Sequence, residues 1–340
     1  MSTSTVLFTR RGSRLRGNDG VAGSASTNPY PNPKCRAFMP DLLVPYEHPR
    51  WFEPLWAALD RRGVDYRAID VTSHAFDPAD TSPPASLVLS RVAMSAGSRE
   101  PEHPIFYARS LYAHWEASGV RVLNGTRTLA YDTSKALQLA AIARLGLRVP
   151  RTRVVHRPAD VPAAARRVGF PLLVKANIGG AGAGIMRFDD PVTLDEAAAT
   201  GALPTSIDNI LLVQELIPAR DGIVTRMEVL GDAFLYALAV HSDGGFDLCP
   251  ADACVAERPA VRMEATVPTP ELQDAAVRIA RACGLDLGGV ECVHDERTGE
   301  PVFFDINGLS NYVANPLDVL GWDPHDRLVD WLQDKIGEQR

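Results

Sequence analysis

The feature of this 340-residue chain that most constrains its fold is a pair of apolar segments near the C-terminus. Residues 289–294 and 302–307 are separated by a short polar turn around residues 296–299. Two apolar runs joined in this way predict an antiparallel hairpin. One face of the hairpin is expected to form core, and the other is expected to carry polar side chains.

Three oxygen-bearing side chains are expected on that polar face. Because side chains alternate along a strand, Asp305 and Asn307 should share a face with Phe303. Glu291 should face them from the partner strand. The apolar face should hold the other members of the second strand: Val302, Phe304 and Ile306. Two carboxylates and an amide oxygen suit Mg²⁺, which prefers hard oxygen ligands and completes its shell with water and substrate phosphates. The alternative is a polar strand end at which Asn307-Gly308 forms a turn.

Composition is that of an ordinary globular protein, with 46% hydrophobic and 23% charged residues. No apolar run approaches the roughly 20 residues that a membrane helix needs, so no membrane partner is expected. The five cysteines are odd in number and form no CxxC pair, which argues against a disulfide framework or a zinc site. A cytoplasmic location is therefore expected.

Residues 1–38 differ from the rest of the chain. They are rich in Gly, Ser, Asn, Pro and Arg and show no periodic apolar face, so we expect a disordered extension. Their Gly and Pro content argues against an amphipathic targeting helix. They hold six of the 35 basic residues and one of the 42 acidic residues, which leaves the remainder with a formal charge of −12. Nucleic acid is not an expected partner, because phosphate contacts need a basic surface.

From Met39 onward the apolar patterns divide into two regions. Residues 39–125 alternate between strand and helix patterns, which is typical of a small parallel α/β layer. Residues 126–340 predict an α+β fold with antiparallel sheets in two lobes, a central lobe at about 126–215 and a C-terminal lobe at about 216–330. The central lobe should begin with a helix over residues 133–145, capped by Asp132 or Thr133.

A glycine-rich segment joins two apolar strands of the central lobe. Residues 177–184 contain four glycines: Gly179, Gly180, Gly182 and Gly184. Glycine lets backbone N–H groups approach a ligand, and successive free amides form an anion-binding concavity. A strand follows and no Gly-Lys-Ser/Thr is present, which excludes a Walker loop and a Rossmann turn. A flexible hairpin without a ligand is the alternative.

Two lysines occupy positions that a bound anion would explain. Lys175 lies in the apolar run before the glycines, and burying an unpaired ammonium is costly. Lys135 is expected in the first turn of a helix, where its charge opposes the helix dipole. The alternatives are an edge-strand lysine and a solvated helix lysine, both facing water.

Two further segments carry polar groups among apolar residues. Residues 211–218 predict an apolar strand ending in a polar bend, which can hold a flat heterocycle between apolar neighbours. Arg226 should share a strand face with Glu228, where it forms an ion pair or directs its guanidinium at a phosphoryl group.

The order of these features resembles the ATP-grasp superfamily and, within it, the RimK-like amino-acid ligases. It comprises a helix lysine, a lysine followed by a glycine-rich hairpin, a Gln-Glu bend, an arginine strand and an E…D-x-N hairpin. The resemblance covers roughly residues 85–316. It implies an α/β N-terminal domain followed by an α+β ATP-grasp fold with two lobes.

The resemblance also implies the residues of a nucleotide site. Ten positions would contact ATP: Lys135, Lys175, Gly179, Gly180, Gly182, Gly184, Gln214, Glu215, Leu216 and Ile217. Three would ligate Mg²⁺, with Mn²⁺ as an alternative ion: Glu291, Asp305 and Asn307. Arg226 would be the catalytic residue that steadies the transferred phosphoryl group.

Three departures from the family pattern concern the ribose and the substrate. Ser134 and Val224 stand where relatives commonly have acids, which leaves Glu215 or Asp221 as the candidate for the ribose. Residues 243–254 lack the usual Arg/Asn pattern of the acceptor region. Substrate selection is therefore assigned to residues that follow strand ends: Arg91, Ser310, Asn311 and Tyr312.

The activity that the resemblance implies is ATP-dependent carboxylate–amine ligation. A carboxylate would attack the γ-phosphate to give an acyl phosphate and ADP, and an amine would then displace phosphate. The expected partners are small-molecule carboxylates and amines, including amino acids and small peptides. Two alternatives are an ATP-grasp kinase and a nucleotide-binding module without catalysis.

Removal of residues 1–38 should leave both the melting temperature and the ATP affinity unchanged. The reason is that the segment has no periodic apolar face with which to dock on the rest of the chain. Thermal denaturation and calorimetry of the shortened protein test this. A drop of several degrees would show that the segment packs after all.

Overall fold

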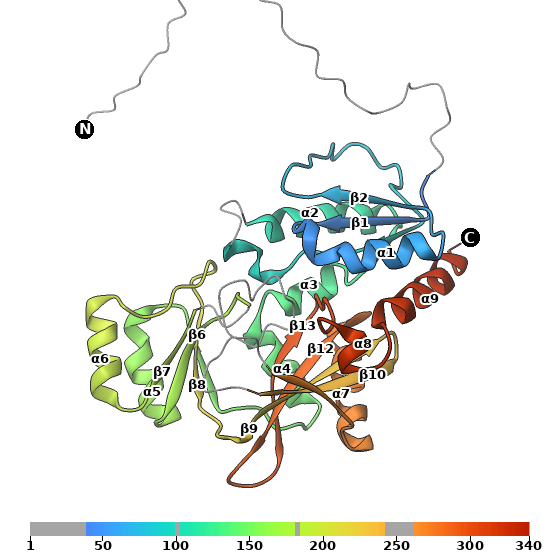
Figure 1. Ribbon diagram of the computed structural model, residues 1–340. Helices are drawn as coiled ribbons and strands as arrows, with labels where there is room; N and C mark the ends of the chain where they lie inside the picture. The colour runs from blue at the N-terminus through green and yellow to red at the C-terminus, as the bar shows by residue number, and fades with distance from the viewer. Residues whose placement is uncertain (1–38, 99–102, 181–183, 242–261, 340) are drawn as a thin grey trace, which may run out of the picture. The chain divides into compact units, whose positions relative to one another are not determined.

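The computed structural model describes residues 39–98, 103–180, 184–241 and 262–339, which belong to one folded unit. These residues form three sheets with helices packed on them (Figure 1). The first sheet is parallel, whereas the strands of the second and third pair in antiparallel fashion. The prediction of an α/β layer followed by two lobes with antiparallel sheets is confirmed.

The first sheet has the strand order β2-β1-β3-β4. Its strands are short: β1 (Leu42–Tyr46), β2 (Tyr66–Asp70), β3 (Leu87–Leu89) and β4 (Arg121–Leu123). Alternate side chains of β1 enter different cores. Leu42 and Val44 belong to the core that includes helix α1 (Glu53–Arg61), which follows the 3₁₀ turn η1 (Pro49–Phe52). Leu43 belongs to the core of helix α2 (Pro104–Ala117), which follows the 3₁₀ turn η2 (Met94–Ser98). Both faces of the parallel sheet are therefore covered, as such sheets require.

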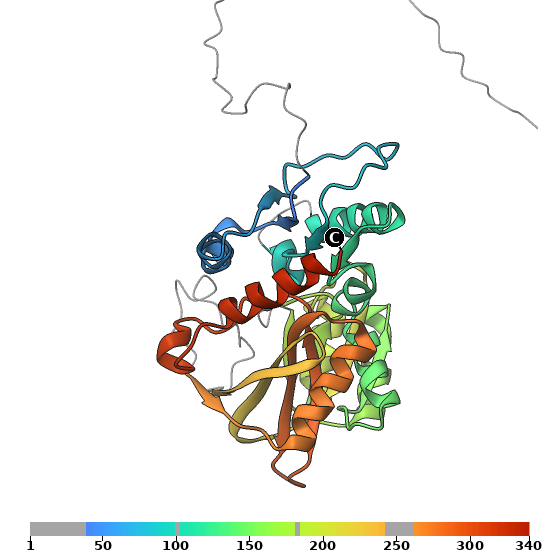
Figure 2. The ribbon, with the colours of Figure 1, turned by 90° about the vertical axis from the view of Figure 1, so that its right-hand side faces the viewer.

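The C-terminal helix α9 (Pro324–Gly337) packs beside α1, although the two are far apart in sequence (Figures 1 and 2). Leu328 and Leu332 of α9 share a core with Leu55 of α1. Arg61 also pairs with Asp326 at 2.9 Å. The end of the chain thus returns to the first domain, a contact that the sequence patterns did not predict.

The central sheet has the strand order β5-β8-β6-β7. Its strands are β5 (Thr152–Val155), β6 (Leu172–Ala176), β7 (Ile185–Phe188) and β8 (Leu211–Glu215). Helices α5 (Val161–Val168), which follows the 3₁₀ turn η3 (Pro158–Asp160), and α6 (Pro191–Thr200) pack on one face. Leu172 and Val174 point into that helical core. The intervening Leu173 and Lys175 therefore face the opposite side, toward the third sheet's lobe.

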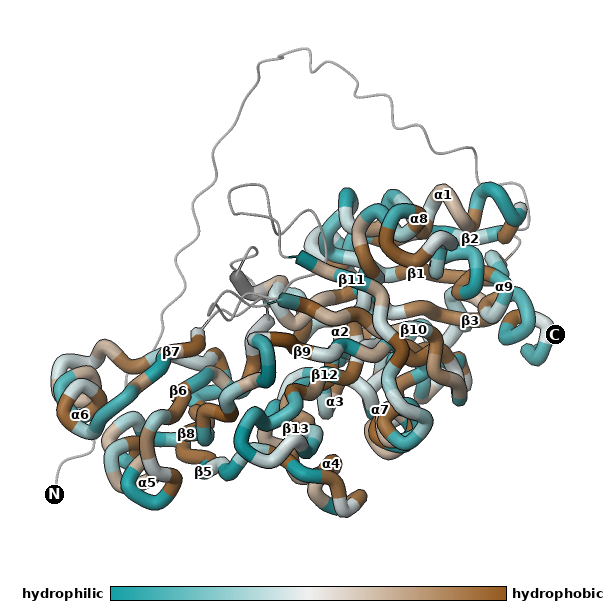
Figure 3. Tube along the Cα trace, turned by 60° about the horizontal axis from the view of Figure 1, so that its bottom comes forward, coloured by the Kyte–Doolittle hydropathy of each residue, from teal (hydrophilic) through white to brown (hydrophobic). Residues whose placement is uncertain are grey.

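The third sheet has the strand order β11-β10-β9-β12-β13. Its strands are β9 (Ala219–Leu230), β10 (Ala233–His241), β11 (Met263–Thr266), β12 (Leu287–Asp295) and β13 (Pro301–Asn307). Helices α4 (Lys135–Arg144) and α7 (Pro270–Cys283) contribute to the core on one face. Helices covering the sheets show alternating brown and teal turns in Figure 3, because each presents an apolar stripe to its sheet.

The register of the predicted hairpin contains a bulge that corrects one expectation. Glu291 pairs with Asp305, but the next residue of β12, Cys292, pairs with Phe303, so Phe304 has no cross-strand partner. The extra residue reverses the alternation below it. Phe303 is therefore buried in the helix-covered core with Ile306, and Phe304 lies on the face of Asp305. The expected placement of Phe303 with the two polar residues was wrong.

The helix expected over residues 133–145 begins two residues later, as α4, and a separate helix α3 (Thr126–Asp132) precedes it. A further short helix, α8 (Pro316–Val319), precedes α9. The cap of α4 is Ser134, whose Oγ accepts a hydrogen bond from the Leu137 N–H at 3.3 Å. Asp132 instead accepts from the Gly308 N–H at 2.8 Å, so it links α3 to the end of the hairpin. The expected cap at Asp132 or Thr133 was wrong.

Within the described part of the chain, no helix combines the length and the apolar character needed to cross a membrane.

Replacing Gly288 by alanine should destabilise the fold much more than the same change at Gly201. Both glycines have positive φ, 155° and 73°, but a Cβ at Gly288 would overlap the Asn307 carbonyl oxygen, whereas one at Gly201 has open space. We expect Gly201→Ala to cost about 1 kcal/mol for left-handed backbone, and Gly288→Ala to cost about 3 kcal/mol because overpacking is added. Urea denaturation measures both. Equal losses would contradict the packing of Gly288 against the hairpin.

Candidate functional site

A cavity of about 680 Å³ is lined by the central sheet, the third sheet and residues of the first domain. Its size is in the range of small-molecule sites. It gathers thirteen of the predicted site residues: Lys135, Lys175, Gly179, Gly180, Gln214, Glu215, Leu216, Ile217, Arg226, Glu291, Asp305, Asn307 and Asn311. Among the other predicted residues, Gly184, Arg91, Ser310 and Tyr312 are not part of its lining, and Gly182 lies outside the described residues.

The polar face of the third sheet is built from two cross-strand rows. In the first row, Arg226 of β9 pairs with Glu291 of β12, which pairs with Asp305 of β13. In the second row, Glu228 and Asn307 flank Gly289. Directly opposed side chains of a sheet lie close together. The register alone therefore brings the predicted catalytic arginine next to the predicted metal ligands.

All three guanidinium nitrogens of Arg226 are hydrogen-bonded. Nε donates to Glu228 at 2.7 Å, Nη1 donates to Glu291 at 3.0 Å and Nη2 donates to the Ser310 Oγ at 3.3 Å. Although burial opposes the charge, Glu228 and Glu291 raise the pKa of Arg226 above its usual range. A Cβ at Gly289 would lie 3.0 Å from Nη2, so the missing side chain makes room for the guanidinium.

Lys135, the first residue of α4, provides a positive charge next to Asp305. Its Nζ donates to the Asp305 carboxylate at 2.5 Å. The lysine begins α4, and the side chain of Asn177 accepts a hydrogen bond from the Ala136 N–H at 3.0 Å. Because Asn177 also begins the glycine-rich segment, the start of α4 and the start of that segment are held together.

Lys175 is buried in β6, with 4% of its surface exposed. No hydrogen bond or ion pair to its ammonium occurs among the residues that the structure describes. Burial lowers the pKa of Lys175 to about 8, and the neighbouring charge of Lys135 acts in the same direction. A buried cation without a partner, on the wall of a cavity, points to an anionic ligand.

The described part of the glycine-rich segment contacts the first domain. A Cβ at Gly180 would lie 3.1 Å from the Cβ of Ser95, which belongs to η2. Gly184 has a φ of 72°, and a Cβ there would lie 3.2 Å from the Cβ of Ala176. Both positions therefore favour glycine, one because of close packing and the other because of its backbone conformation as well.

The apolar end of the cavity lies at the end of β8. Leu173, Ile185, Leu216 and Phe304 provide apolar lining there. Gln214 also lines this part and donates from Nε2 to the Thr152 hydroxyl at 3.1 Å. A slot between apolar side chains beside a strand end suits a planar heterocycle.

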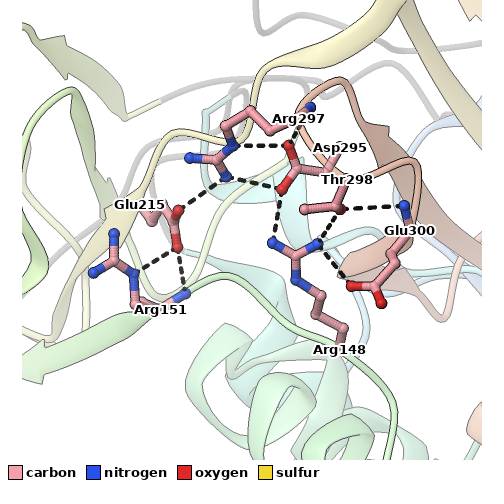
Figure 4. Close-up of polar contacts among 7 residues, drawn as sticks. All are labelled: Arg148, Arg151, Glu215, Asp295, Arg297, Thr298 and Glu300. Atoms are coloured by element: carbon pink, nitrogen blue, oxygen red, sulfur yellow. Dashed lines mark hydrogen bonds and ion pairs between the residues drawn. The ribbon is translucent and has the colours of Figure 1, made fainter.

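Glu215, one candidate for the ribose, is already engaged by two arginines (Figure 4). Its Oε2 accepts from the Arg151 Nε at 2.9 Å, and its Oε1 accepts from the Arg297 Nη2 at 3.0 Å. Although burial opposes this, these hydrogen bonds lower the pKa of Glu215. The other candidate, Asp221, is exposed with a φ of 57°, and it is absent from the described lining, which includes the next residue, Gly222.

The network of Figure 4 continues into the turn of the β12–β13 hairpin. Asp295 is fully buried and accepts from Arg297 at 2.8 Å and from Arg148 at 2.7 Å. Hydrogen bonds from Arg297 hold the pKa of Asp295 well below its usual range. Arg148 precedes β5 and Glu215 ends β8, so the turn binds both connections between the central and C-terminal lobes.

A family model described as the RimK-like ATP-grasp domain matches residues 130–316, more than half of the chain. The chain belongs to the RimK-like ATP-grasp family. The sequence-based recognition of this family is confirmed.

Relatives of the RimK-like ATP-grasp domain include named ligases. A probable alpha-L-glutamate ligase of Parasynechococcus marenigrum (strain WH8102) is 27% identical over 251 residues, 68% of this chain but 49% of the relative, so the chain spans about half its length. The ribosomal protein bS6–L-glutamate ligase of Salmonella paratyphi B (strain ATCC BAA-1250 / SPB7) is 27% identical over 232 residues, 67% of this chain and 72% of that ligase.

A solved structure shows the same ATP-grasp fold. The ligase PsnB in complex with a minimal precursor, Mg and ADP aligns with a TM-score of 0.62 at 19% identity. The alignment covers 87% of this chain and 97% of the PsnB chain. The predicted fold class is thereby confirmed.

ATP-grasp proteins use ATP with Mg²⁺, and the oxygen donors of Glu291, Asp305 and Asn307 fit this ion. No cluster of three or more His, Cys, Asp or Glu side chains suited to a metal occurs in the described ranges. Mg²⁺ does not need one, because it is commonly held by one or two carboxylates plus substrate phosphates. Glu291 and Asp305 are cross-strand neighbours, and the Asn307 Nδ2 donates to Glu291 at 3.1 Å, which leaves its amide oxygen available.

Several lining residues of this ATP-grasp site were not predicted: Trp51, Asp132, Arg187 and Arg297. Asp132 was considered only as a helix cap, and Arg297 only as part of a turn. Burial raises the pKa of Asp132 to about 6. Trp51 and Arg187 carry no local sequence signal, because only the tertiary fold brings them to the cavity.

Lys175→Met should stabilise the ligand-free protein at pH 7 and remove its stabilisation by ATP. With a folded pKa of about 8 and an unfolded value of about 10.4, the charge is present in both states at pH 7, and burying it costs on the order of 3 kcal/mol. Between these two values the unfolded state binds more protons, so wild-type stability rises with pH and the advantage of the variant shrinks.

Thermal denaturation from pH 7 to 10, with and without Mg·ATP, tests this prediction. Lys335→Met, which changes a lysine on α9 paired with Glu338, is the matched control. A Lys175→Met protein that is less stable at pH 7 and still gains stability from ATP would contradict the assignment.

Proposed function

We propose that this protein is an ATP-dependent carboxylate–amine ligase that works through an acyl phosphate and releases ADP. The observation that carries the proposal is the row Arg226–Glu291–Asp305 beside the unpartnered ammonium of Lys175. Phosphoryl transfer needs electrostatic stabilisation and positioning rather than a protein nucleophile. The ligase names of the relatives support the same reaction class.

The nucleotide is assigned to the part of the cavity between the central sheet and the third sheet. Adenine would lie between Leu216, Ile217 and Phe304, next to Gln214. The phosphates would meet the ammonium of Lys175 and backbone N–H groups of the glycine-rich segment. Lys135 would contact the same phosphates, because its ammonium lies next to the Asp305 carboxylate.

Mg²⁺ would be held by Glu291, Asp305 and the amide oxygen of Asn307. The ion supplies positive charge that offsets the charge of the triphosphate and aligns its oxygens. Mg²⁺ is also the ion in the related PsnB complex, and nothing in that comparison favours Mn²⁺.

Arg226 is assigned to the γ-phosphate as it is transferred. A substrate carboxylate oxygen forms a bond to the γ-phosphorus while the bond to the β-phosphate oxygen breaks and ADP leaves. The amine nitrogen then bonds to the acyl carbon, loses a proton and expels phosphate. Arg226 can stabilise the charge in both steps because hydrogen bonds to Glu228, Glu291 and Ser310 hold its guanidinium in place.

The substrates are assigned to the part of the cavity that borders the first domain. Trp51, Met94, Leu309 and Asn311 line it. The Asn311 Oδ1 is buried and has no hydrogen-bond partner among the described residues, so it can accept an N–H from the amine. Amino acids and small peptides are the proposed substrates. In support, PsnB was solved in complex with a minimal precursor, and the Salmonella relative is named for a ribosomal protein.

Asp305→Asn should lower turnover about 100-fold or more while shifting the melting temperature by only a few degrees, because it removes charge where the phosphoryl group is transferred. ADP release with a panel of amino acids and dipeptides measures turnover. Asp232→Asn, which changes an exposed carboxylate paired with Arg281, is the control and should keep full activity. Unchanged turnover in Asp305→Asn would remove the metal assignment.

Hydroxylamine separates the ligase from a kinase. With substrate acid and Mg·ATP, it should trap the activated acyl group as a hydroxamate, and nucleotide analysis should find ADP and phosphate. A phosphorylated alcohol without hydroxamate would establish the kinase, and AMP with pyrophosphate would exclude the acyl-phosphate route.

A further inference from the structure

Arg91 is an arginine buried between domains, with 1% of its surface exposed. It follows β3 of the first domain, and its Nη2 donates to the backbone oxygen of Ser310 at 2.9 Å. Its guanidinium lies 5.6 Å from the ring centroid of Phe52. Burial lowers the pKa of Arg91 to about 10. Burying this guanidinium costs desolvation free energy. Because Arg91 is absent from the described lining of the cavity, direct contact with substrate does not explain its burial.

Ser310 links this arginine to Arg226. Ser310 has 0% of its surface exposed and follows the end of β13. Its backbone oxygen accepts from Arg91, while its hydroxyl oxygen accepts from the Arg226 Nη2 at 3.3 Å. The same hydroxyl oxygen accepts from the Tyr312 N–H at 3.1 Å, which closes the turn. Two buried guanidinium groups, from different parts of the fold, thus bind the two oxygen atoms of Ser310.

The three acceptors of Arg226 differ in how they are fixed. Glu228 and Glu291 belong to β9 and β12, so the sheet itself sets their positions. Ser310 lies in no helix or strand. Side-chain contacts therefore help to fix its position, and the first domain contributes the hydrogen bond from Arg91. Of the three hydrogen bonds that orient the Arg226 guanidinium, the one to Ser310 is therefore open to control from outside the third sheet.

The turn after Ser310 is strained and incompletely hydrogen-bonded. Tyr312 has a φ of 59°, a conformation that is costly for a tyrosine, and its buried hydroxyl has no partner among the described residues. Arg91 Nε and Nη1 and Glu228 Oε2 are likewise buried without partners in the described ranges. Such costs persist where the surroundings enforce a particular geometry. The strained backbone at Tyr312 and these unpartnered buried atoms lower the stability of the fold, so they favour a functional explanation.

We propose that Arg91 is a positioning residue for Arg226. By holding the Ser310 carbonyl, it fixes the Ser310 hydroxyl and so orients the guanidinium that meets the transferred phosphoryl group. The proposal rests on the function assigned to Arg226 above. In this proposal Arg91 acts on Arg226, whereas its place in the sequence indicated a role in binding the substrate. It also gives the first domain a part in the chemical step.

The kinetic test compares Arg91→Met, Arg91→Lys and Arg121→Met. Arg121 is the matched control, because it also joins the first domain to the C-terminal lobe, through Asp286 at 3.0 Å, but has no link to Arg226. Arg91→Met should lower kcat about tenfold while the KM for ATP stays within about twofold, since the nucleotide contacts are untouched. Arg91→Lys should recover part of kcat, because an ammonium can still donate to a carbonyl. Arg121→Met should keep kcat.

A double-mutant cycle tests whether Arg91 acts through Ser310. Ser310→Ala removes the hydroxyl that binds Arg226 but keeps the carbonyl that binds Arg91. If the two act in series, the double variant Arg91→Met with Ser310→Ala should lose no more kcat than Ser310→Ala alone. Additive losses would overturn the proposal, as would a rise in substrate KM without a fall in kcat.

A readout that needs no turnover keeps this proposal separate from the ligase assignment. In protein labelled with ¹⁵N-arginine, the Arg226 Nε–H signal, identified by its loss in Arg226→Lys, should shift and exchange faster with solvent in Arg91→Met and Ser310→Ala. It should be unchanged in Arg121→Met. An unaltered signal in Arg91→Met would overturn the positioning role, whether or not the wild-type protein forms hydroxamate.

Discussion

The site depends on the cross-strand register that aligns Arg226, Glu291 and Asp305. Burying a charge is costly unless it has an opposite partner, and here Arg226 pairs with Glu291 at one end of the row while Lys135 of α4 pairs with Asp305 at the other. A slip of one residue would move these groups to the face covered by α4 and α7. The register is therefore required both to avoid unpaired buried charge and to bring the arginine to the carboxylates.

Lys175 is not part of these ion pairs. The row pairs its own charges within the protein, so the fold can form without ligand. The ammonium of Lys175, on the opposite sheet, keeps no partner among the described groups and remains buried. A triphosphate would add the missing negative charge between the two sheets. An anionic ligand would thus offset the cost of burying Lys175, and this favours the binding of anions over neutral molecules.

Local patterns predicted much of this arrangement, because the hairpin, the lysine before the glycines and the polar bend each lie within a few residues of chain. They did not predict features that depend on groups distant in the sequence. The bulge at Phe304 exchanged the faces of Phe303 and Phe304, and alternation alone cannot locate a bulge. Glu215 is a candidate for the ribose, and its contact with Arg297, 82 residues away, had no local signal. Arg91 followed a strand end as expected, yet its partner Ser310 is 219 residues away.

The β12–β13 hairpin connects the two ends of the proposed nucleotide site. Near the open end of its strands it carries Glu291 and Asp305, and at its turn Asp295 and Arg297 bind the connections that enter and leave the central sheet. Backbone bonds reinforce this, since the Glu296 N–H donates to the Pro218 oxygen at 2.9 Å. Four residues of extended chain separate Glu291 from Asp295, about 13 Å. One strand therefore sets the distance between the carboxylates and the bend assigned to adenine.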